Sequence, residues 1–473
     1  MSEIGARLER LPYSHAHRRL LVMGGLGYTF DAMDQAIMAF VLPVVSVLWS
    51  LGSVQTGVLG SATYIGFFFG ALSAGILGDL IGRKVVMMWA LAIYSVATVA
   101  SAFAVDWSLF FSCRVVAGYG AGAESVIVAP FLSEFVASRY RGGFTGALAG
   151  FFSFGFVGAA LFGYFLIPLA PDAWRYAVFL TATPIVMLLW WRRALPESPR
   201  WLESRGRRAE AEAVVSWLEE TIEREEDVKL PPPAVTSVAP VPVGGTFLGN
   251  LAALWSKPLR RMTLMSWLVW FSLTSCYYAF FTWIPSLLVK SGLTITKSFG
   301  YSLVIYLAQI PGYYSAAFLV ERVGRKFTIV TYLALGGASA LGLATAHDDL
   351  AITLAGFCLS FFMNGTYAGL YAYTPEIFPT EVRTTGCGTA SAVGRIGAII
   401  SPIAVGYIFP IAGFAGVFGL TTAVLLLGAL AVLILGIPTR GLSLEAIAAA
   451  ELGAGEADPS PAPSDALPIR SPR

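Results

Sequence analysis

Five ionisable side chains interrupt long apolar stretches of this sequence, where charge is otherwise rare. They are Asp31, Asp34, Arg114, Glu124 and Arg395. A charged side chain near the centre of a bilayer costs about 2.5–3.5 kcal/mol on insertion scales, so such residues normally line a cavity or pair with one another. The set indicates proton transfer and charge selection within a membrane. Because the sequence offers no nucleophile–base or metal-ligand pattern, we do not expect an enzyme, a metal site or a cofactor.

Asp34 and Arg114 are predicted to lie at a similar depth in the membrane. At 1.5 Å per helical residue, Asp34 is about 20 Å from the start of the first predicted span. Arg114 is about 9 Å from the opposite start of the fourth, within a core about 30 Å thick. The two can therefore form an ion pair. If the arginine moves between conformations, the carboxylate can take up and release a proton; the alternative is a static structural pair.

The roles of the other three ionisable residues are open. Asp31 lies one helical turn before Asp34 on the same face and could hold the proton instead. Glu124 is about 15 Å from Arg114 along the helix, so it is either a second proton site or a hydrogen-bonding residue in helix packing. Arg395 could bind a substrate carboxylate in a bidentate contact, or it could neutralise Glu124 or Asp31.

Aromatic and amide side chains in the second half of the chain are candidates to bind a substrate. Tyrosine and tryptophan can stack on an aromatic ring, although in membrane proteins they also serve as packing or interfacial anchors. With the arginine described above, the predicted substrate-binding residues are Arg395, Tyr277, Tyr278, Trp283, Tyr306, Gln309, Tyr313, Asn364, Tyr367 and Tyr371.

The elements that position these residues are predicted to be membrane-spanning helices. Only 13% of residues are charged and 56% are hydrophobic, whereas soluble proteins carry about 25% charged residues. A span needs about 20 mostly apolar residues. That rule predicts an all-α membrane protein with twelve spans, at 20–48, 54–78, 84–104, 108–135, 143–169, 174–194, 261–289, 298–320, 327–346, 350–376, 385–410 and 413–437.

Lysine and arginine concentrate in alternate loops, which predicts that both termini and the central loop are cytoplasmic. We expect a multi-pass protein of the plasma (inner) membrane. Residues 1–194 form the first six-helix bundle in this prediction, and 261–440 form the second. The linker at 195–260 carries surface helices, and the Pro- and Ala-rich tail at 441–473 is predicted to be cytoplasmic and largely disordered.

One constant offset relates charged residues of the two halves. Arg83, Glu134 and Arg141 recur 242 residues later, at positions 325, 376 and 383, so the helices between them match in number and length. Because these residues fall at predicted cytoplasmic helix ends, we expect a gate that latches in one state and releases in another. Ordinary loop charges are the alternative. The predicted gate residues are Asp79, Arg83, Glu134, Arg141, Glu321, Arg325, Glu376 and Arg383.

These motifs resemble the major facilitator superfamily, in its sugar-porter-like branch. The resemblance rests on Gly78-Asp79 with Gly82-Arg83-Lys84, on Pro196-Glu197-Ser198-Pro199-Arg200, and on Pro375-Glu376-Ile377-Phe378-Pro379. Phe30-Asp31-Ala32-Met33-Asp34 and Gly394-Arg395-Ile396-Gly397 are more similar to bacterial niacin transporters, metabolite–proton symporters and synaptic-vesicle transporter-like proteins. The Gln-Gln pair that sugar porters carry in helix 7 is absent from 271–278.

The resemblance implies two pseudo-symmetric six-helix bundles around a central cavity and proton coupling through the Asp34–Arg114 pair. The predicted function is proton-coupled import of a small aromatic or carboxylated metabolite, such as nicotinate, by alternating access. The main alternative is an organic cation or drug carrier, in which Asp31, Asp34 and Glu124 would bind the substrate. A sugar porter or a non-transporting receptor fits less well. Expected partners are the substrate, a proton and the bilayer, with no nucleic acid, and the protein is expected to be a monomer.

Overall fold

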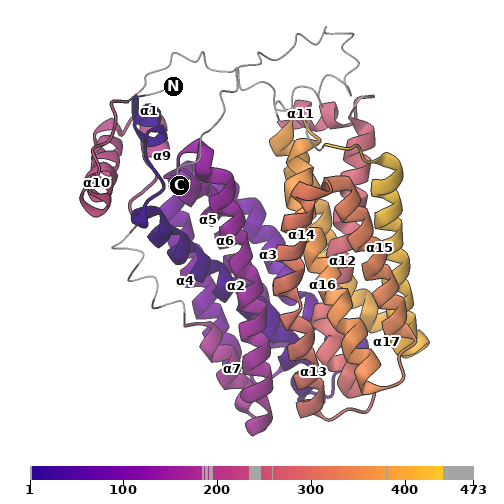
Figure 1. The fold of residues 1–473 in the computed structure, drawn as a ribbon. Coiled ribbons are helices and arrows are strands. Elements are labelled where there is room, and N and C mark those ends of the chain that lie inside the picture. The colour runs from indigo at the N-terminus through magenta and orange to yellow at the C-terminus, as the bar shows by residue number, and fades with distance from the viewer. Residues whose placement is uncertain are drawn as a thin grey trace, which may run out of the picture.

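The computed structural model describes residues 3–183, 186, 190, 195–233, 247–257, 259–379 and 382–439. These residues form a bundle of long helices with short connections (Figure 1). Ten helical segments of the described chain are long and apolar enough to cross a membrane. The predicted tail at 441–473 lies outside the described residues.

Two sets of long helices lie next to each other in Figure 1. The first set is α2 (His15–Leu48), α3 (Ser53–Ile81), α4 (Arg83–Ala102), α5 (Trp107–Ser133), α6 (Ser138–Phe165), η1 (Ile167–Leu169) and α7 (Ala173–Thr181). The second set is α12 (Arg260–Lys290), α13 (Ile295–Leu307), α14 (Gln309–Arg322), α15 (Arg325–Ala344), α16 (Asp349–Glu376) and α17 (Arg383–Leu435). We refer to these sets as the first and the second half.

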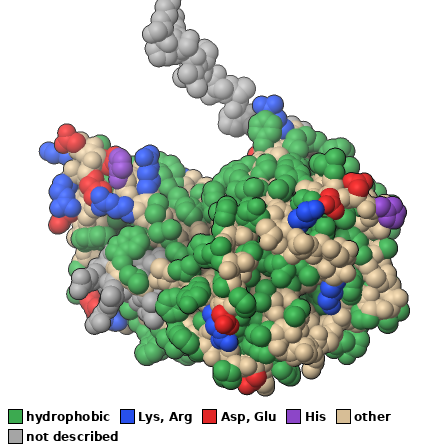
Figure 2. All heavy atoms as spheres, turned by 90° about the horizontal axis from the view of Figure 1, so that it is seen from below, with side chains coloured by type: hydrophobic (Ala, Val, Ile, Leu, Met, Phe, Trp, Pro, Cys, Tyr) green, Lys and Arg blue, Asp and Glu red, His purple; other side chains and the backbone are tan. Residues whose placement is uncertain are grey.

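Four short helices gather at one end of the molecule, which we call the linker side. They are α1 (Glu3–Glu9), α9 (Pro199–Ser204), α10 (Arg208–Glu226) and α11 (Phe247–Leu254), at the top of Figure 1. The opposite end, where α7 and α13 lie, is called the distal side. Figure 2 shows the molecule from the distal side: hydrophobic side chains are spread over both halves, charged ones are few across the face, and a group of charged side chains lies at one edge, at the upper left.

Two of the twelve predicted spans differ in detail from the helices. The last two predicted spans both lie in α17, which is divided as predicted by non-helical backbone at Gly413, where φ is 62° and ψ is −161°. The predicted span at 298–320 divides into α13 and α14, because the ring of Pro311 displaces the carbonyl four residues earlier, at the end of α13. The span at 174–194 begins in α7, and most of its second half lies outside the described residues.

The two halves pack most closely toward the distal side. A Cβ added to Gly57 of α3 would lie 2.5 Å from the backbone oxygen of Pro402 in α17. One added to Gly406 would lie 2.6 Å from the oxygen of Ser53. Near the linker side, a Cβ at Gly146 or Gly388 would meet no atom within 4 Å. The halves are therefore closed against each other distally and leave open space at the linker ends of α6 and α17.

Helices α3 and α5 approach so closely that only glycine fits at their crossing. An added Cβ would lie 1.8 Å from the Val115 oxygen at Gly66, and 1.9 Å from the Tyr119 oxygen at Gly70. Small residues allow membrane helices to pack backbone against backbone. This contact fixes the register of α5, the helix that carries Arg114 and Glu124.

We expect Gly66→Leu to lower the melting temperature of the detergent-solubilised protein, because the new side chain would collide with the backbone of α5. Overpacking typically costs about 1–3 kcal/mol, and a clash with backbone lies at the upper end. Gly75→Leu on the same helix is the control, since nothing lies within 4 Å of its Cβ position. Equal melting temperatures for the two variants would contradict the packing argument.

Candidate functional site

Asp34 and Arg114 form a fully buried ion pair between α2 and α5. The Arg114 Nη2 atom lies 2.6 Å from Asp34 Oδ2, and Nη1 lies 2.9 Å from Oδ1. Nη2 also donates to the backbone oxygen of Asp34 and to Thr63 Oγ1. Asp34 Oδ1 accepts two further hydrogen bonds, from Thr98 at 3.2 Å and Thr181 at 2.8 Å. Both Asp34 oxygens therefore have partners, and the bidentate geometry is the strong form of this interaction.

Asp31 and Glu124 have a very different environment. Both side chains are fully buried, and none of their four carboxyl oxygens has a hydrogen-bond partner among the described residues. The two groups lie within electrostatic range of each other. Transferring one unpaired carboxylate into a low-dielectric interior carries an idealised cost of order 20 kcal/mol, and several kcal/mol after relaxation. Two ionised and unpaired carboxylates are not stable here.

Arg395 of α17 reaches across to the first half. Its guanidinium carbon lies 4.0 Å from the ring centroid of Phe67 on α3, a cation–π distance. The predicted alternative, neutralisation of Asp31 or Glu124, is wrong, because the oxygens of both acids lack a partner in the described chain. The arginine is stabilised by an aromatic face instead of by an acid.

Tyrosines surround this arginine from both halves. Tyr278, Tyr367 and Tyr371 lie within electrostatic range of the guanidinium, as does Tyr28 of α2. The rings of Tyr367 and Tyr371 are stacked, 6.2 Å apart, and Tyr371 is 57% exposed. Tyr313 is within electrostatic range of Tyr371. This arrangement offers one cation and several ring faces to a small molecule.

Two amide side chains lie beside Tyr277, next to the tyrosine cluster. Tyr277 donates its hydroxyl to Gln309 Oε1 at 3.0 Å, and the side chain of Asn364 lies near the same hydroxyl. Its ring lies 5.1 Å from that of Tyr367. The amide nitrogens of Gln309 and Asn364 are buried and have no acceptor among the described residues. Two unused donors thus remain near the aromatic rings.

Trp283 and Tyr306 are fully buried, and their polar atoms have partners. The Trp283 Nε1 atom donates to the Pro402 oxygen of the same half at 2.9 Å, and the Tyr306 hydroxyl donates to the Phe281 oxygen at 2.7 Å. The Tyr306 ring packs on Phe40 of α2, 5.4 Å between centroids, and so belongs to an aromatic seal between the halves. Because both side chains are buried and satisfied, we remove them from the predicted substrate-binding set.

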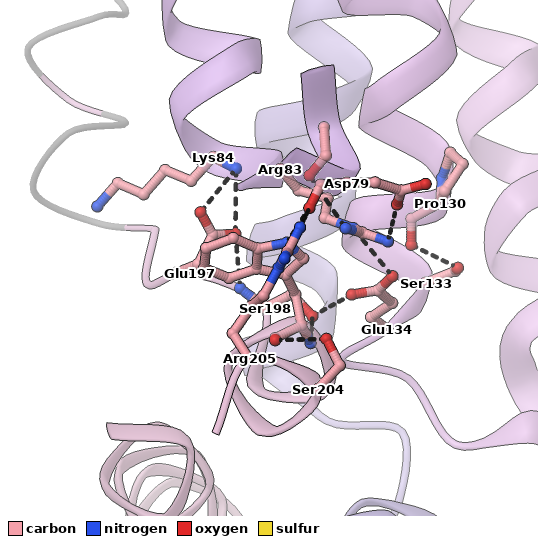
Figure 3. Close-up of polar contacts among 12 residues, drawn as sticks. Asp79, Arg83, Lys84, Pro130, Ser133, Glu134, Glu197, Ser198, Ser204 and Arg205 are labelled. Carbon is pink, nitrogen blue, oxygen red and sulfur yellow. Dashed lines mark hydrogen bonds and ion pairs between the residues drawn. The ribbon is translucent and has the colours of Figure 1, made fainter. Parts of the chain in front are cut away.

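On the linker side, Arg83 connects α3, α4 and α5 (Figure 3). It pairs with Asp79 at 2.9 Å and lies 3.6 Å from Glu134. Glu134 accepts a hydrogen bond from Ser198, which caps α9. Glu197 accepts from the backbone nitrogen of Lys84, at the start of α4. The motif residues therefore tie the linker to the helix ends of the first half.

The second half repeats these contacts at the 242-residue offset. Arg325 pairs with Glu321 at 3.0 Å and with Glu376 at 3.1 Å. Thr439 donates a hydrogen bond to Glu376, as Ser198 does to Glu134 in the first half. The glycines before the two arginines, Gly82 and Gly324, both have φ of 107°, a conformation that other residues rarely adopt.

Arg141 and Arg383 also occupy matching positions, each donating to the carbonyl five residues earlier. Arg141 additionally lies 3.6 Å from Glu9 of α1. Burial raises the pKa of Glu9, but hydrogen bonds from Ser138, together with Arg200 and Arg141, outweigh it and hold that pKa below its usual range. A carboxylate of the N-terminal helix thus joins the charged cluster at the linker side of the first half.

Sequence reasoning missed several contributors to these sites. Thr63, Thr98 and Thr181 complete the cage around Asp34 and Arg114, yet isolated threonines in apolar helices carry no distinctive pattern. Phe67 likewise gives no signal among other phenylalanines. Glu197 and Ser198 belong to a motif that the sequence analysis did identify. A serine directly before Pro199 is typical of a helix N-cap, and this pattern indicates a structural role.

Comparison with known proteins agrees with this architecture. Residues 23–450 match the family described as sugar (and other) transporter. The chain is 39% identical to the niacin transporter NiaP of Acinetobacter baylyi over 446 residues, covering 94% of this chain and 99% of that protein. It is 36% identical to the putative niacin/nicotinamide transporter NiaP of Bacillus subtilis over 431 residues, 91% and 98% of the two chains.

Solved structures share the fold at much lower identity. The partially occluded inward open conformation of the xylose transporter XylE from E. coli superposes with a TM-score of 0.75 at 15% identity, covering 91% of this chain and all of that one. The predicted resemblance to the major facilitator superfamily and to niacin transporters is confirmed. Taken with the apolar helices, these matches establish a multi-pass membrane transporter of the major facilitator fold, and the chain belongs to the sugar (and other) transporter family.

Proposed function

We propose that this protein imports a small aromatic carboxylate, such as nicotinate, together with a proton. The observation that carries the proposal is Arg395, a cation on the face of Phe67 whose surroundings are tyrosine rings rather than acids. A substrate carboxylate would complete a charge-assisted hydrogen-bonded pair with it. The similar proteins named as niacin transporters support the same substrate class.

Transport would proceed by alternating access between the two halves. The halves pack tightly at the distal side, where Gly57 and Gly406 meet backbone of the opposite half. By the positive-inside rule the linker side is cytoplasmic. The conformation described here would then be closed to the outside. The matched ion-pair clusters at Arg83 and Arg325 would rearrange when the cytoplasmic side closes.

An organic cation carrier of the same fold is the second candidate. Its supporting observation is the pair of buried, unpartnered acids, Asp31 and Glu124, which a substrate cation could neutralise. Arg395 opposes this interpretation. It lies within electrostatic range of Tyr28, as do both acids, so a substrate cation at the acids would meet a positive charge nearby. A thermal-shift comparison of nicotinate, nicotinamide and a quaternary ammonium ion separates the two: stabilisation by nicotinate alone supports the carboxylate carrier.

Arg395→Ala is expected to weaken nicotinate binding about ten- to hundredfold, because a hydrogen bond to a charged group contributes about 1.5–3 kcal/mol. Isothermal titration on purified protein measures this. Arg322→Ala is the matched control, since Arg322 also lies over a phenylalanine ring, at 4.4 Å from Phe318, on α14 near the linker side. Equal affinities of wild type and Arg395→Ala would exclude the anionic-substrate proposal.

We expect Asn364→Leu to reduce discrimination between nicotinate and benzoate. Nicotinate has a ring nitrogen that can accept a hydrogen bond from an unused amide donor, and benzoate has none. A neutral hydrogen bond contributes about 0.5–1.5 kcal/mol, so nicotinate affinity should fall about two- to tenfold while benzoate affinity holds. Gln309→Leu is the parallel test of the second donor. Equal losses for both ligands in both variants would show that neither amide reads the ring nitrogen.

The double variant Glu134→Gln/Glu376→Gln should transport several-fold more slowly while binding nicotinate with wild-type affinity. Both substitutions remove one carboxylate from the arginine clusters at the linker side, and neither residue forms an ion pair or hydrogen bond with Arg395 in the described part of the chain. Initial uptake rates in proteoliposomes, compared with equilibrium binding, give the answer. Glu220→Gln on the exposed face of α10 serves as the control. An unchanged uptake rate in the double variant would remove the clusters from the transport cycle.

A further inference from the structure

The buried acids of the first half fall into two classes that the sequence does not distinguish. Asp34 is held by an arginine and two threonine hydroxyls. Asp31, one turn away on the same helix, and Glu124 on α5 have no partner for any carboxyl oxygen among the described residues. All three side chains are fully buried, so the difference lies in the donors around them and not in access to water.

Two neighbouring tyrosine hydroxyls do not supply the missing donors, because their hydrogens are used elsewhere. The hydroxyl of Tyr28 on α2 donates to the Ser125 oxygen at 2.6 Å. The hydroxyl of Tyr94 on α4 donates to the Thr181 oxygen at 2.5 Å. Both tyrosines are within electrostatic range of Asp31 and Glu124. They surround the two acids without stabilising a negative charge.

The buried arginine of α5 is directed at the other acid. Both terminal nitrogens of Arg114 bind Asp34, and its Nε donates to neither Asp31 nor Glu124, since it has no hydrogen-bond partner among the described residues. Asp34 itself acts on Asp31 as a like charge. Arg395 of α17 lies on the ring of Phe67. Like the two acids, Arg395 and Tyr371 of α16 lie within electrostatic range of Tyr28. A buried carboxyl group without a donor or a cation is favoured in its neutral form.

We propose that Asp31 and Glu124 form a protonated two-carboxyl site, and that this site, rather than Asp34, supplies the proton coupled to transport. In the conformation described here the pair holds at least one proton. The Asp34–Arg114 pair stays in contact and fixes α2 against α5. When the halves rearrange, a donor or water that reaches Asp31 or Glu124 allows the proton to leave. This inference rests on the proposed proton coupling and assigns its carrier.

Infrared spectroscopy of the purified protein tests the protonated pair without any transport. A protonated carboxyl group has a carbonyl stretch that a carboxylate lacks. At neutral pH we expect this band in wild type, and its loss or weakening in Asp31→Asn and in Glu124→Gln. Asp172→Asn is the control, because that carboxylate is exposed and paired with Arg175. A wild-type spectrum without the band, or variants that keep it unchanged, would overturn the proposal.

Transport in proteoliposomes tests the coupling. Asp31→Asn and Glu124→Gln should lose nicotinate accumulation driven by a pH gradient and retain nicotinate exchange at equal pH, because amides cannot titrate. The two variants are independent, so one that misfolds leaves the other informative, and melting temperatures identify it. Gradient-driven accumulation in both variants would overturn the assignment. If wild type itself ignores the pH gradient, the proposed proton coupling fails, while the infrared band still reports on the pair.

Discussion

The cost of placing charge in a membrane interior organises this protein more than any other constraint. The chain meets that cost in three ways. Asp34 and Arg114 neutralise each other in a bidentate pair, Arg395 lies on the ring of Phe67, and Asp31 with Glu124 lack any compensating donor in the described chain. The first arrangement is stable in a fixed conformation. The other two have no counter-charge among the described residues, and such sites are where a substrate and a proton can bind.

Helix packing decides where those charges meet. The glycine contacts between α3 and α5 bring Arg114 opposite Thr63 and Asp34. On the distal side, direct backbone approach between α3 and α17 and an aromatic seal around Tyr306 join the halves. Near the linker side the matching glycines Gly146 and Gly388 face open space. Close contact at one end and free space at the other is the asymmetry that a rocking motion of the halves would reverse.

The repeated charge clusters show symmetry with a local exception. Asp79, Arg83 and Glu134 make the contacts that Glu321, Arg325 and Glu376 make in the second half. Only the first half adds a carboxylate from the N-terminal helix, where Glu9 receives hydrogen bonds from Ser138 and pairs with Arg200. Arg7 and Arg10 of the same segment also bind Glu219 of α10. The N-terminal segment and the linker helices therefore add ion pairs to the first half beyond those of the repeated cluster.

The sequence by itself determined the membrane class, the major facilitator fold and the constant offset between the halves, because apolar length and repeated charged motifs are local properties of the chain. Depth counting also placed Asp34 level with Arg114, since both lie on straight helices of known rise. Only the tertiary structure decided which buried charges have partners. Whether Arg395 meets an acid or a ring, whether Trp283 faces a substrate or packs against α17, and whether Asp31 finds a donor all depend on helix rotation and on contacts between segments far apart in the sequence. No spacing rule within one helix encodes these contacts.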